Sequence, residues 1–391
     1  MLNRLVLKIA ALFTLIMVTL PCWAIDGFIL QTTDYSFRQK WGCSSSPSVS
    51  YIPVSDTVFH EQTLYISVVV SDYQINAKKK ADVGFSLEVF SPDNSLYMRL
   101  TDLPVLKEKL QSSSPYLSRH VVNLAFPKES SCGKYRIKVV VKDNMANVSK
   151  KLESEVFLTT LPSYDVTSFD EQSMIEWMDR YHLDPHPEQA LACFLYASQS
   201  GMIDFVESSL PFLSMMMEIY RHNTFLYPQL LDYDAYKNND TQQYLLILIH
   251  RLGLGDADFR SSLDTAGQEV MASFDSIPDI DIYGDVYSPI VFDMLWGTFM
   301  ASGSYQPVLR LIQLLDYAKY KNVLEKIKDW ENVSEKDAAL AVKYLCYQSL
   351  VWSLSSNCEQ HPLVRQYCEW ALQHEKLSKL QRSELQKILQ R

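Results

Sequence analysis

The hydrophobic period of this sequence changes at one short stretch, residues 161–171. Before the stretch, apolar residues alternate with polar ones, as expected of half-buried β-strands, and after it they recur every three to four residues, as on a helix face. Pro162 cannot donate to a strand ladder, so we expect the last strand to end there. Ser168 and Glu171 have the spacing of a capping box, which predicts the start of a helix. The chain therefore divides into a β part, 25–162, and an α part, 163–391.

Residues 1–24 have the pattern of a secretory signal peptide. Arg4 and Lys8 form its basic end, an apolar run follows, and residues 22–24 have the small-x-small pattern of a cleavage site. The apolar run is short for a membrane span, and no later stretch has about 18 uninterrupted apolar residues. We therefore expect an exported protein, periplasmic or secreted, whose mature chain has no transmembrane segment. Acylation of Cys22 as a lipoprotein is the alternative, although Pro21 stands where that processing needs a small residue.

The predicted mature chain is acidic. The whole sequence has a net charge of −10, and the signal segment holds two basic residues and no acidic ones. Phosphate backbones repel a negative surface, so we do not expect nucleic acid as a partner. The hydrophobic content of 47% is that of a globular protein, and 391 residues are more than one ordinary core, which favours two domains.

The β part contains about seven short strand-like segments with turn residues between them, a number and spacing that predict an antiparallel β-sandwich. In the clearest segment, from Gly133 to Asn144, Tyr135 and Ile137 lie on one face and Arg136 lies on the other. Its Gly-x-Tyr-x-x-x-Val-x-Val-x-Asp pattern resembles the late strand of immunoglobulin-like domains in exported bacterial proteins. The resemblance implies an adhesive or spacer module, a fold that carries no activity by itself.

The α part contains helix pairs that are separated by short Gly and Ser breaks. The expected pairs are 189–199 with 203–220, 289–301 with 305–320, and 334–354 with 362–374. Ser334 is expected to cap the last pair, and Cys358 to lie in the loop within it. Such pairs pack as antiparallel hairpins, so we predict an all-α helical-hairpin domain. A solenoid-like array stays open as an alternative, because the pairs are loosely similar but irregularly spaced.

Segment 293–303, which is rich in apolar residues and ends in Ser-Gly, resembles a pattern of uncharacterised exported bacterial proteins with two domains. The resemblance brings no known chemistry with it. Four tryptophans in this half fall at apolar helix positions, where we expect core packing rather than a ligand cage. They are Trp296, Trp330, Trp352 and Trp370.

Six cysteines remain after removal of the signal segment, an even number that is compatible with disulfides in an exported protein. The candidate disulfides are Cys43 with Cys132, the two cysteines of the β part, and Cys358 with Cys368 in the last helix pair. Cys193 and Cys346 lie inside apolar helical runs, where simple core packing is expected.

His182, Asp184 and His186 place two imidazoles and a carboxylate within five residues, a spacing that suits zinc. However, Pro185 and Pro187 predict a loop here, in which Asp184 or His186 caps the next helix. No third or fourth ligand can be assigned from the sequence. We therefore predict no metal and no other cofactor, and keep these three residues as candidates for a zinc site.

Two further motifs suggest chemistry that their context does not support. Residues 264–269, Asp-Thr-Ala-Gly-Gln-Glu, match the switch motif of small GTPases, but the sequence has no phosphate-binding Gly-x-x-x-x-Gly-Lys-Ser/Thr motif beside it. Asp275, Asp279, Asp281 and Asp285 could suit calcium, but isoleucines interleave with them and the spacing is not that of an EF-hand. We expect the GTPase-like string to be a chance match and the four aspartates to lie in a solvated loop.

No nucleophile elbow and no recognisable Cys and His pair occur in the sequence. We therefore predict no catalytic residues and expect an exported binding or scaffold protein that acts through protein–protein contacts. The alternative is an envelope or secreted hydrolase with its site in the α part or at the domain junction. A secreted effector that acts on a host is a third hypothesis, without specific support in the sequence.

Overall fold

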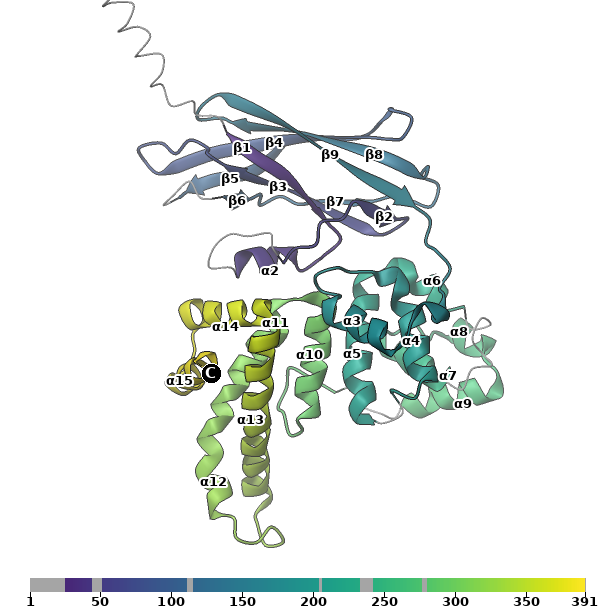
Figure 1. Ribbon diagram of the computed structural model, residues 1–391, viewed down its shortest axis with the longest axis vertical. Helices are drawn as coiled ribbons and strands as arrows, with labels where there is room; N and C mark the ends of the chain where they lie inside the picture. Colours follow the sequence, from purple (N-terminus) through teal and green to yellow (C-terminus); the bar gives the residue numbers. More distant parts are fainter. Residues whose placement is uncertain are drawn as a thin grey trace, which may run out of the picture. The chain divides into compact units, whose positions relative to one another are not determined.

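The computed structural model describes residues 25–43, 51–110, 115–203, 206–232, 242–275 and 280–390. Apart from α2 (Phe37–Gly42), its strands precede its helices along the chain (Figure 1). Helix accounts for 49% of the structure and strand for 21%. The prediction of a β region followed by an α region is therefore confirmed. The predicted signal peptide, 1–24, lies outside the described residues.

The strands of the described residues form two sheets. They are β1 (Asp26–Thr32), β2 (Thr57–Phe59), β3 (Thr63–Ser71), β4 (Lys80–Phe90), β5 (Leu96–Lys109), β6 (Tyr116–Leu117), β7 (Val122–Ala125), β8 (Gly133–Asp143) and β9 (Val148–Thr159). One sheet has the order β1-β3-β6 with β7 also paired to β3, and the other has the order β2-β9-β8-β4-β5. The pairings of β4 with β5 and with β8 are antiparallel.

Alternation builds one buried face on the five-stranded sheet. In β8 the buried side chains are Tyr135, Ile137, Val139 and Val141, the face predicted from the sequence. In β4, the strand next to β8 in the same sheet, Val83, Phe85, Leu87 and Val89 are buried in the same way. Register shifts interrupt the pairing of β4 with β5 at three places. Such bulges bend a strand and increase its twist, which fits the curled, half-barrel form of the sheets.

The helices of the described residues follow β9. They are α3 (Glu171–Arg180), α4 (Ala190–Gln199), α5 (Val206–His222), α6 (Tyr227–Leu230), α7 (Gln242–Arg251), α8 (Ala257–Ser262), α9 (Thr265–Phe274), α10 (Ile290–Ser302), α11 (Tyr305–Leu314), α12 (Lys321–Lys326), α13 (Glu335–Gln360), α14 (Pro362–His374) and α15 (Lys379–Leu389), with short 3₁₀ turns η1 (Val166–Ser168), η2 (Pro187–Gln189), η3 (Thr224–Leu226) and η5 (Leu315–Tyr320). None of these helices combines the length and the apolar character that a bilayer crossing requires.

The chain forms two compact units. The strand unit contains Ile66–Val122, Gly133–Phe157 and the described residues up to Gln31, and the helical unit contains Thr32–Tyr65, Asn123–Cys132 and Leu158–Arg391. Because it includes residues 32–65, the helical unit also contains α2. Its core consists of two clusters, one built mainly from α3 to α9 and one from α10 to α15.

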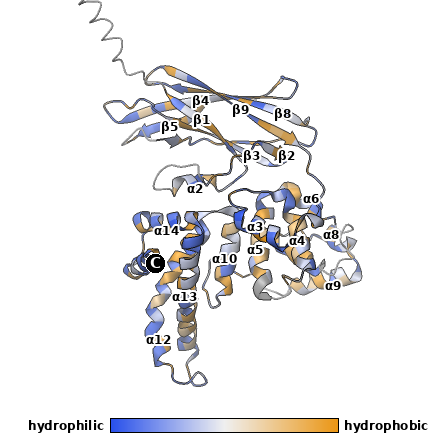
Figure 2. Ribbon diagram, viewed as in Figure 1, coloured by the Kyte–Doolittle hydropathy of each residue, from blue (hydrophilic) through white to orange (hydrophobic). Residues whose placement is uncertain are grey.

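Helices α5 and α10 pack closely against each other, and hydrophobic residues gather along both (Figure 2). Gly297 makes this possible, because a Cβ at this position would lie 2.3 Å from the carbonyl oxygen of Pro211. A side chain would push the two backbones apart. The glycine of segment 293–303 is thus explained by a helix crossing.

The helix ends confirm some predictions and correct others. Ser334 caps α13 as expected, and the predicted breaks fall at Gly201 and Gly303, both with positive φ. The capping box predicted at Ser168 is wrong: Asp170 caps α3 together with Ser173, and Ser168 lies in η1. Ser, Thr and Asp are all competent caps, so sequence spacing alone did not choose between them.

Helix α13 is longer than predicted. It continues to Gln360, so Cys358 lies in the helix rather than in a loop. The expectation that all four tryptophans pack in the core is also wrong, since Trp330 is 49% and Trp352 is 73% exposed. Trp352 lies two residues from buried Leu350 and Leu354, a spacing that places it on the opposite face of α13.

Candidate functional site

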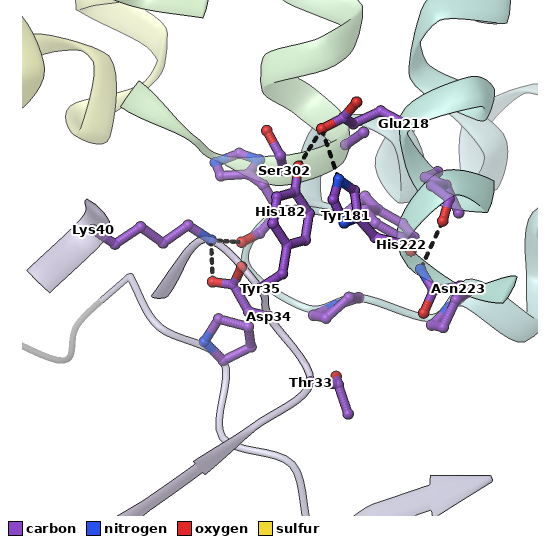
Figure 3. A pocket seen from close by; sticks show the side chains of 15 residues that line it. Thr33, Asp34, Tyr35, Lys40, Tyr181, His182, Glu218, His222, Asn223 and Ser302 are labelled. Atoms are coloured by element: carbon purple, nitrogen blue, oxygen red, sulfur yellow. Dashed lines mark hydrogen bonds and ion pairs between the residues drawn. The ribbon is translucent and has the colours of Figure 1, made fainter. Parts of the chain in front are cut away.

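Polar side chains from distant parts of the chain line a small pocket in the helical unit (Figure 3). They come from the segment before α2, from α2 itself, from the turn after α3, from α5 and from the end of α10. The main polar residues are Asp34, Tyr35, Lys40, His182, Glu218, His222 and Ser302. Local geometry sets three of these positions. Asp34 accepts hydrogen bonds from the backbone and hydroxyl of Ser36, and Glu218 and His222 lie one helical turn apart on α5.

Lys40 and Asp34 form a buried ion pair in this pocket. The Lys40 Nζ lies 2.7 Å from the Asp34 Oδ2, and the two side chains are 1% and 6% exposed. The same Nζ donates a hydrogen bond of 2.8 Å to the carbonyl oxygen of His182. Burial lowers the pKa of Lys40, and the Asp34 carboxylate opposes that shift. The lysine thus joins α2 to the turn after α3 and satisfies both charges internally.

Gly303 leaves room for the lysine. This residue ends α10 with φ +61°, in the left-handed region that favours glycine. A Cβ here would lie 2.6 Å from the Lys40 Cε and 2.8 Å from its Nζ. The break that the sequence predicted between two helices is therefore also the position that accommodates the buried charge.

Tyr35, Glu218 and His222 form a second polar group. The Tyr35 hydroxyl donates to the Glu218 Oε1, and the His222 Nε2 lies 3.3 Å from the same oxygen. The rings of Tyr35 and His222 are stacked. Burial tends to raise the pKa of Glu218, but the contacts with His222 and Tyr35 outweigh it and lower that pKa overall. Burial raises the pKa of Tyr35, so its hydroxyl stays protonated.

This pocket is nearly full. Its volume is about 30 Å³, enough for a water molecule but not for a substrate. The serine of its lining, Ser302, is also engaged, because its hydroxyl donates to the Thr298 carbonyl. A network whose members satisfy one another fixes structure rather than performing chemistry.

His182 differs from its neighbours because it is buried but incompletely paired. It is 4% exposed, and its Nδ1 has no hydrogen-bond partner among the described residues. Its ring packs against Phe299, with centroids 5.1 Å apart, and lies 6.1 Å from the ring of His361. Burial lowers the pKa of His182 to about 3, and Lys40 and His361 add to the effect. The imidazole is therefore neutral at physiological pH.

A larger cleft in the same unit shares His182 with the small pocket. Its volume is about 480 Å³. It is lined by Tyr51, Asp179, Arg180, His182, Leu183, Gln360, His361, Pro362 and Leu363. Burial lowers the pKa of His361 too, with Asp179 opposing, so two neutral imidazoles line the cleft beside an exposed arginine and aspartate. This arrangement has the size and the mixed lining of a ligand site.

The structure separates the three metal candidates. Asp184 and His186 lie close together, with 3.5 Å between the Oδ1 and the Nε2, and the His186 Nδ1 is 3.0 Å from Glu188. His182 is buried away from them, against Phe299. In the part of the chain that the structure describes, no group of three or more His, Cys, Asp or Glu residues is arranged to hold a metal ion.

The six cysteines of the described residues are all free thiols. Cys43 is partly buried and Cys132 is exposed, and no bond joins them. Cys358 and Cys368 are buried with their Sγ atoms 3.6 Å apart. Cys193 and Cys346 are buried in the helical core, as expected.

The other acidic motifs have structural roles. Asp264, the first residue of the GTPase-like string, caps α9 by accepting from the Gly267 amide at 2.8 Å. Asp275 pairs with Arg260, and Asp285 pairs with Lys343. These last two carboxylates are thus engaged with separate cations. Asp279 lies outside the described residues.

Comparisons with known proteins do not assign a family. No protein-family profile and no curated protein matches the sequence. Among solved structures, the CARDB domain of a Pyrococcus furiosus protein in complex with two metal ions is 13% identical, with 35% of this chain and 90% of that chain covered and a TM-score of 0.19. A family 123 glycoside hydrolase from Clostridium perfringens is 9% identical over 54% of this chain and 36% of its own, with a TM-score of 0.24.

Bacteroides uniformis β-glucuronidase 2 is 10% identical, with 71% of this chain and 32% of that chain covered and a TM-score of 0.21. The chain thus spans about a third of the length of these two hydrolases. Similarity at these TM-scores carries no argument about fold or activity.

Proposed function

We propose that this chain is an exported binding protein, and that the cleft beside His182 and His361 holds a segment of a protein partner. The observation that carries the proposal is the difference in room and pairing: the polar side chains of the small pocket are paired with one another around about 30 Å³, whereas the cleft is about 480 Å³ and is lined by exposed Asp179 and Arg180 beside His361. A cleft of this size, with convergent polar groups on a partly apolar lining, has the character of a ligand site.

The lining of the cleft suits a short peptide segment with both polar and apolar side chains. Arg180 offers a fork of donors for a carboxylate, and neutral imidazoles can each donate one N–H group. Leu183 and Leu363 provide apolar contacts on the same lining. We therefore expect the bound segment to carry a carboxylate next to an apolar side chain.

The strand unit, in this proposal, is an immunoglobulin-like antiparallel sandwich that acts as a spacer, and the helical-hairpin unit carries the binding site. The proposed domains are residues 25–162 and 163–391, after an export signal at 1–24. The Gly133–Asp143 strand supports the first part of this proposal, because its pattern resembles immunoglobulin-like domains of exported bacterial proteins.

A photo-crosslinking amino acid at Leu183 tests the proposal in the mature chain from Ile25. Leu183 lines the cleft and is 38% exposed, so the probe reaches solvent without disturbing the core. Val54, 64% exposed beside Pro53 of the small pocket, is the matched control position. We expect one partner segment to crosslink from position 183 and not from position 54. A synthetic peptide of that segment should then bind wild type at least tenfold more tightly than Arg180→Ala.

A hydrolase with its site in this cleft is the second candidate. It is favoured by the neutral imidazole of His361 on the cleft lining, since a neutral histidine can take up a proton from an attacking water. The same crosslinked peptide distinguishes the two functions. Recovery of the intact peptide after prolonged incubation supports binding, and cleavage that is lost in His361→Ala supports the hydrolase.

A further inference from the structure

Cys358 and Cys368 form a pair of thiols in the core of the helical unit. Cys358 lies two residues before the end of α13, and Cys368 lies in the middle of α14. Their Sγ atoms are 3.6 Å apart, and the two residues are 3% and 0% exposed. The sulfur atoms need to approach by only about 1.5 Å to reach the length of a disulfide.

The turn between the two helices keeps the thiols together. His361 alone separates α13 from α14, and its backbone is extended, with φ −120° and ψ 100°. Pro362 then starts α14 with the fixed φ that suits a first helical position. A one-residue corner of this kind leaves the two helices little freedom to move the sulfur atoms apart.

We propose that Cys358 and Cys368 are a redox-reactive dithiol that closes to a disulfide by exchange with a small disulfide such as oxidised glutathione. Nothing in this inference depends on the proposed binding function. The disulfide would fix the turn between α13 and α14, which carries His361, Pro362 and Leu363, three residues of the cleft lining.

The chemistry begins at Cys358. The contact with Cys368 lowers the pKa of Cys358, and the same contact raises the pKa of Cys368. The Cys358 thiolate attacks one sulfur of the small disulfide and expels a thiolate, which leaves a mixed disulfide on Cys358. Cys368 then transfers its proton to the expelled thiolate, attacks the Cys358 sulfur and releases a second thiolate. The protein loses two electrons and two protons, and the small disulfide becomes two thiols.

Burial affects when the exchange can occur. Because both thiols are shielded from solvent, the reagent must meet them during folding or through a local opening of α14. Once formed, the disulfide is shielded in the same way. We therefore expect it to resist reduction in the folded protein and to be reduced after unfolding.

Mass spectrometry of the wild-type mature chain tests the inference. The protein is refolded with oxidised glutathione, unfolded without reductant in the presence of iodoacetamide, and digested with trypsin. Cleavage after Lys343, Arg365 and Lys376 places Cys358 in peptide 344–365 and Cys368 in peptide 366–376. We expect these peptides to be linked through Cys358, with Cys346 alkylated. Full alkylation of both Cys358 and Cys368 would overturn the inference.

A thermal measurement provides a second test with a matched control. Reduction should lower the Tm of the wild type by about 5 °C, because a closed loop of about ten residues restricts the unfolded chain. Cys346→Ala removes another buried thiol of the same core and should keep this response to reductant, whereas Cys358→Ala should lose it. An equal change in Tm on reduction in both variants contradicts the assignment of the disulfide to Cys358. If the Cys358→Ala chain does not fold, the linkage mapped by mass spectrometry in the wild type decides.

Discussion

The small pocket and the cleft share His182 but differ in how their polar groups are satisfied. In the small pocket, Lys40 is paired with Asp34 and Tyr35 is paired with Glu218, and the free volume between these side chains is only about 30 Å³. In the cleft, imidazoles, an arginine and an aspartate surround about 480 Å³. Similar residue types are thus paired with one another in the small pocket, whereas Asp179 and Arg180 of the cleft are exposed to solvent.

Pairing and volume distinguish the small pocket from the cleft better than residue type does. A buried lysine or tyrosine usually suggests catalysis, because perturbed pKa values cluster at functional sites. Here the perturbed groups of the small pocket contact each other and have no room for a substrate. Structural ion pairs perturb pKa values as well, so pairing and volume have to be considered together.

The largest effect is expected from breaking the buried ion pair. Lys40→Met leaves the Asp34 carboxylate buried without its cation, and we expect a loss of about 3–5 kcal/mol in the free energy of unfolding. Chemical denaturation of the mature chain measures it. The double variant Asp34→Leu with Lys40→Met should be more stable than Lys40→Met alone, since no uncompensated charge remains. A double variant that is less stable would contradict a structural role for the pair.

The next effect is expected at Gly303. Gly303→Ala places a side chain at φ +61° and within 2.6 Å of the Lys40 Cε, so both backbone strain and crowding oppose it. We expect a loss of about 2 kcal/mol, again by denaturation. Gly253→Ala is the matched control, because its φ of +72° brings the same backbone strain and nothing lies within 4 Å of a Cβ there. Equal losses in the two variants would show that Lys40 does not crowd this position.

His182 predicts a pH dependence. Its pKa is about 3 in the folded protein and 6.5 in the unfolded chain, so the unfolded chain takes up the proton first as the pH falls. The contribution of neutral His182 to the free energy of unfolding is therefore complete above pH 6.5. It is lost as the pH falls toward 3, with a slope of about 1.4 kcal/mol per pH unit. From pH 6.5 to 5 the wild type should therefore lose about 2 kcal/mol more than His182→Gln. Identical pH profiles for the two proteins would show that His182 is not buried as described.

The smallest effect is expected on the exposed face of α13. Trp352 is 73% exposed, so Trp352→Ser should change the free energy of unfolding by less than about 0.5 kcal/mol. Trp296→Ser should cost several times more, because that side chain is 7% exposed and donates to Ser353 at 2.6 Å. If Trp352→Ser abolishes partner binding while Arg180→Ala does not, the binding face is on α13 rather than in the cleft.

The order of a β region and an α region could be predicted from the sequence, because local hydrophobic period decides strand and helix. The joins at Gly201 and Gly303 were visible for the same local reason. The candidate site was only partly visible. His182 attracted attention through its neighbours Asp184 and His186, which lie elsewhere, whereas its actual contact His361 is far away along the chain.

The small pocket could not have been found from the sequence. Asp34 and Lys40 lie six residues apart, and nothing local indicates that they pair or that both are buried. Tyr35 meets Glu218 across 183 positions of the chain, a contact that only the folded helices create. The pairing of Cys358 with Cys368 was a hypothesis from the even number of cysteines and from their position on either side of a predicted loop. The sequence does not give the 3.6 Å between their Sγ atoms, because that distance depends on how α13 and α14 pack.

The central claim is that the cleft binds a partner and the small pocket does not. It is tested most directly by the affinity of the peptide captured from position 183 for three purified proteins. Wild type, Arg180→Ala and Tyr35→Phe are compared by titration at a temperature at which all three proteins are folded. The expected result is a Kd that rises at least tenfold in Arg180→Ala and changes less than twofold in Tyr35→Phe. A Kd that is unchanged in Arg180→Ala but raised tenfold in Tyr35→Phe would place binding at the small pocket and contradict the account.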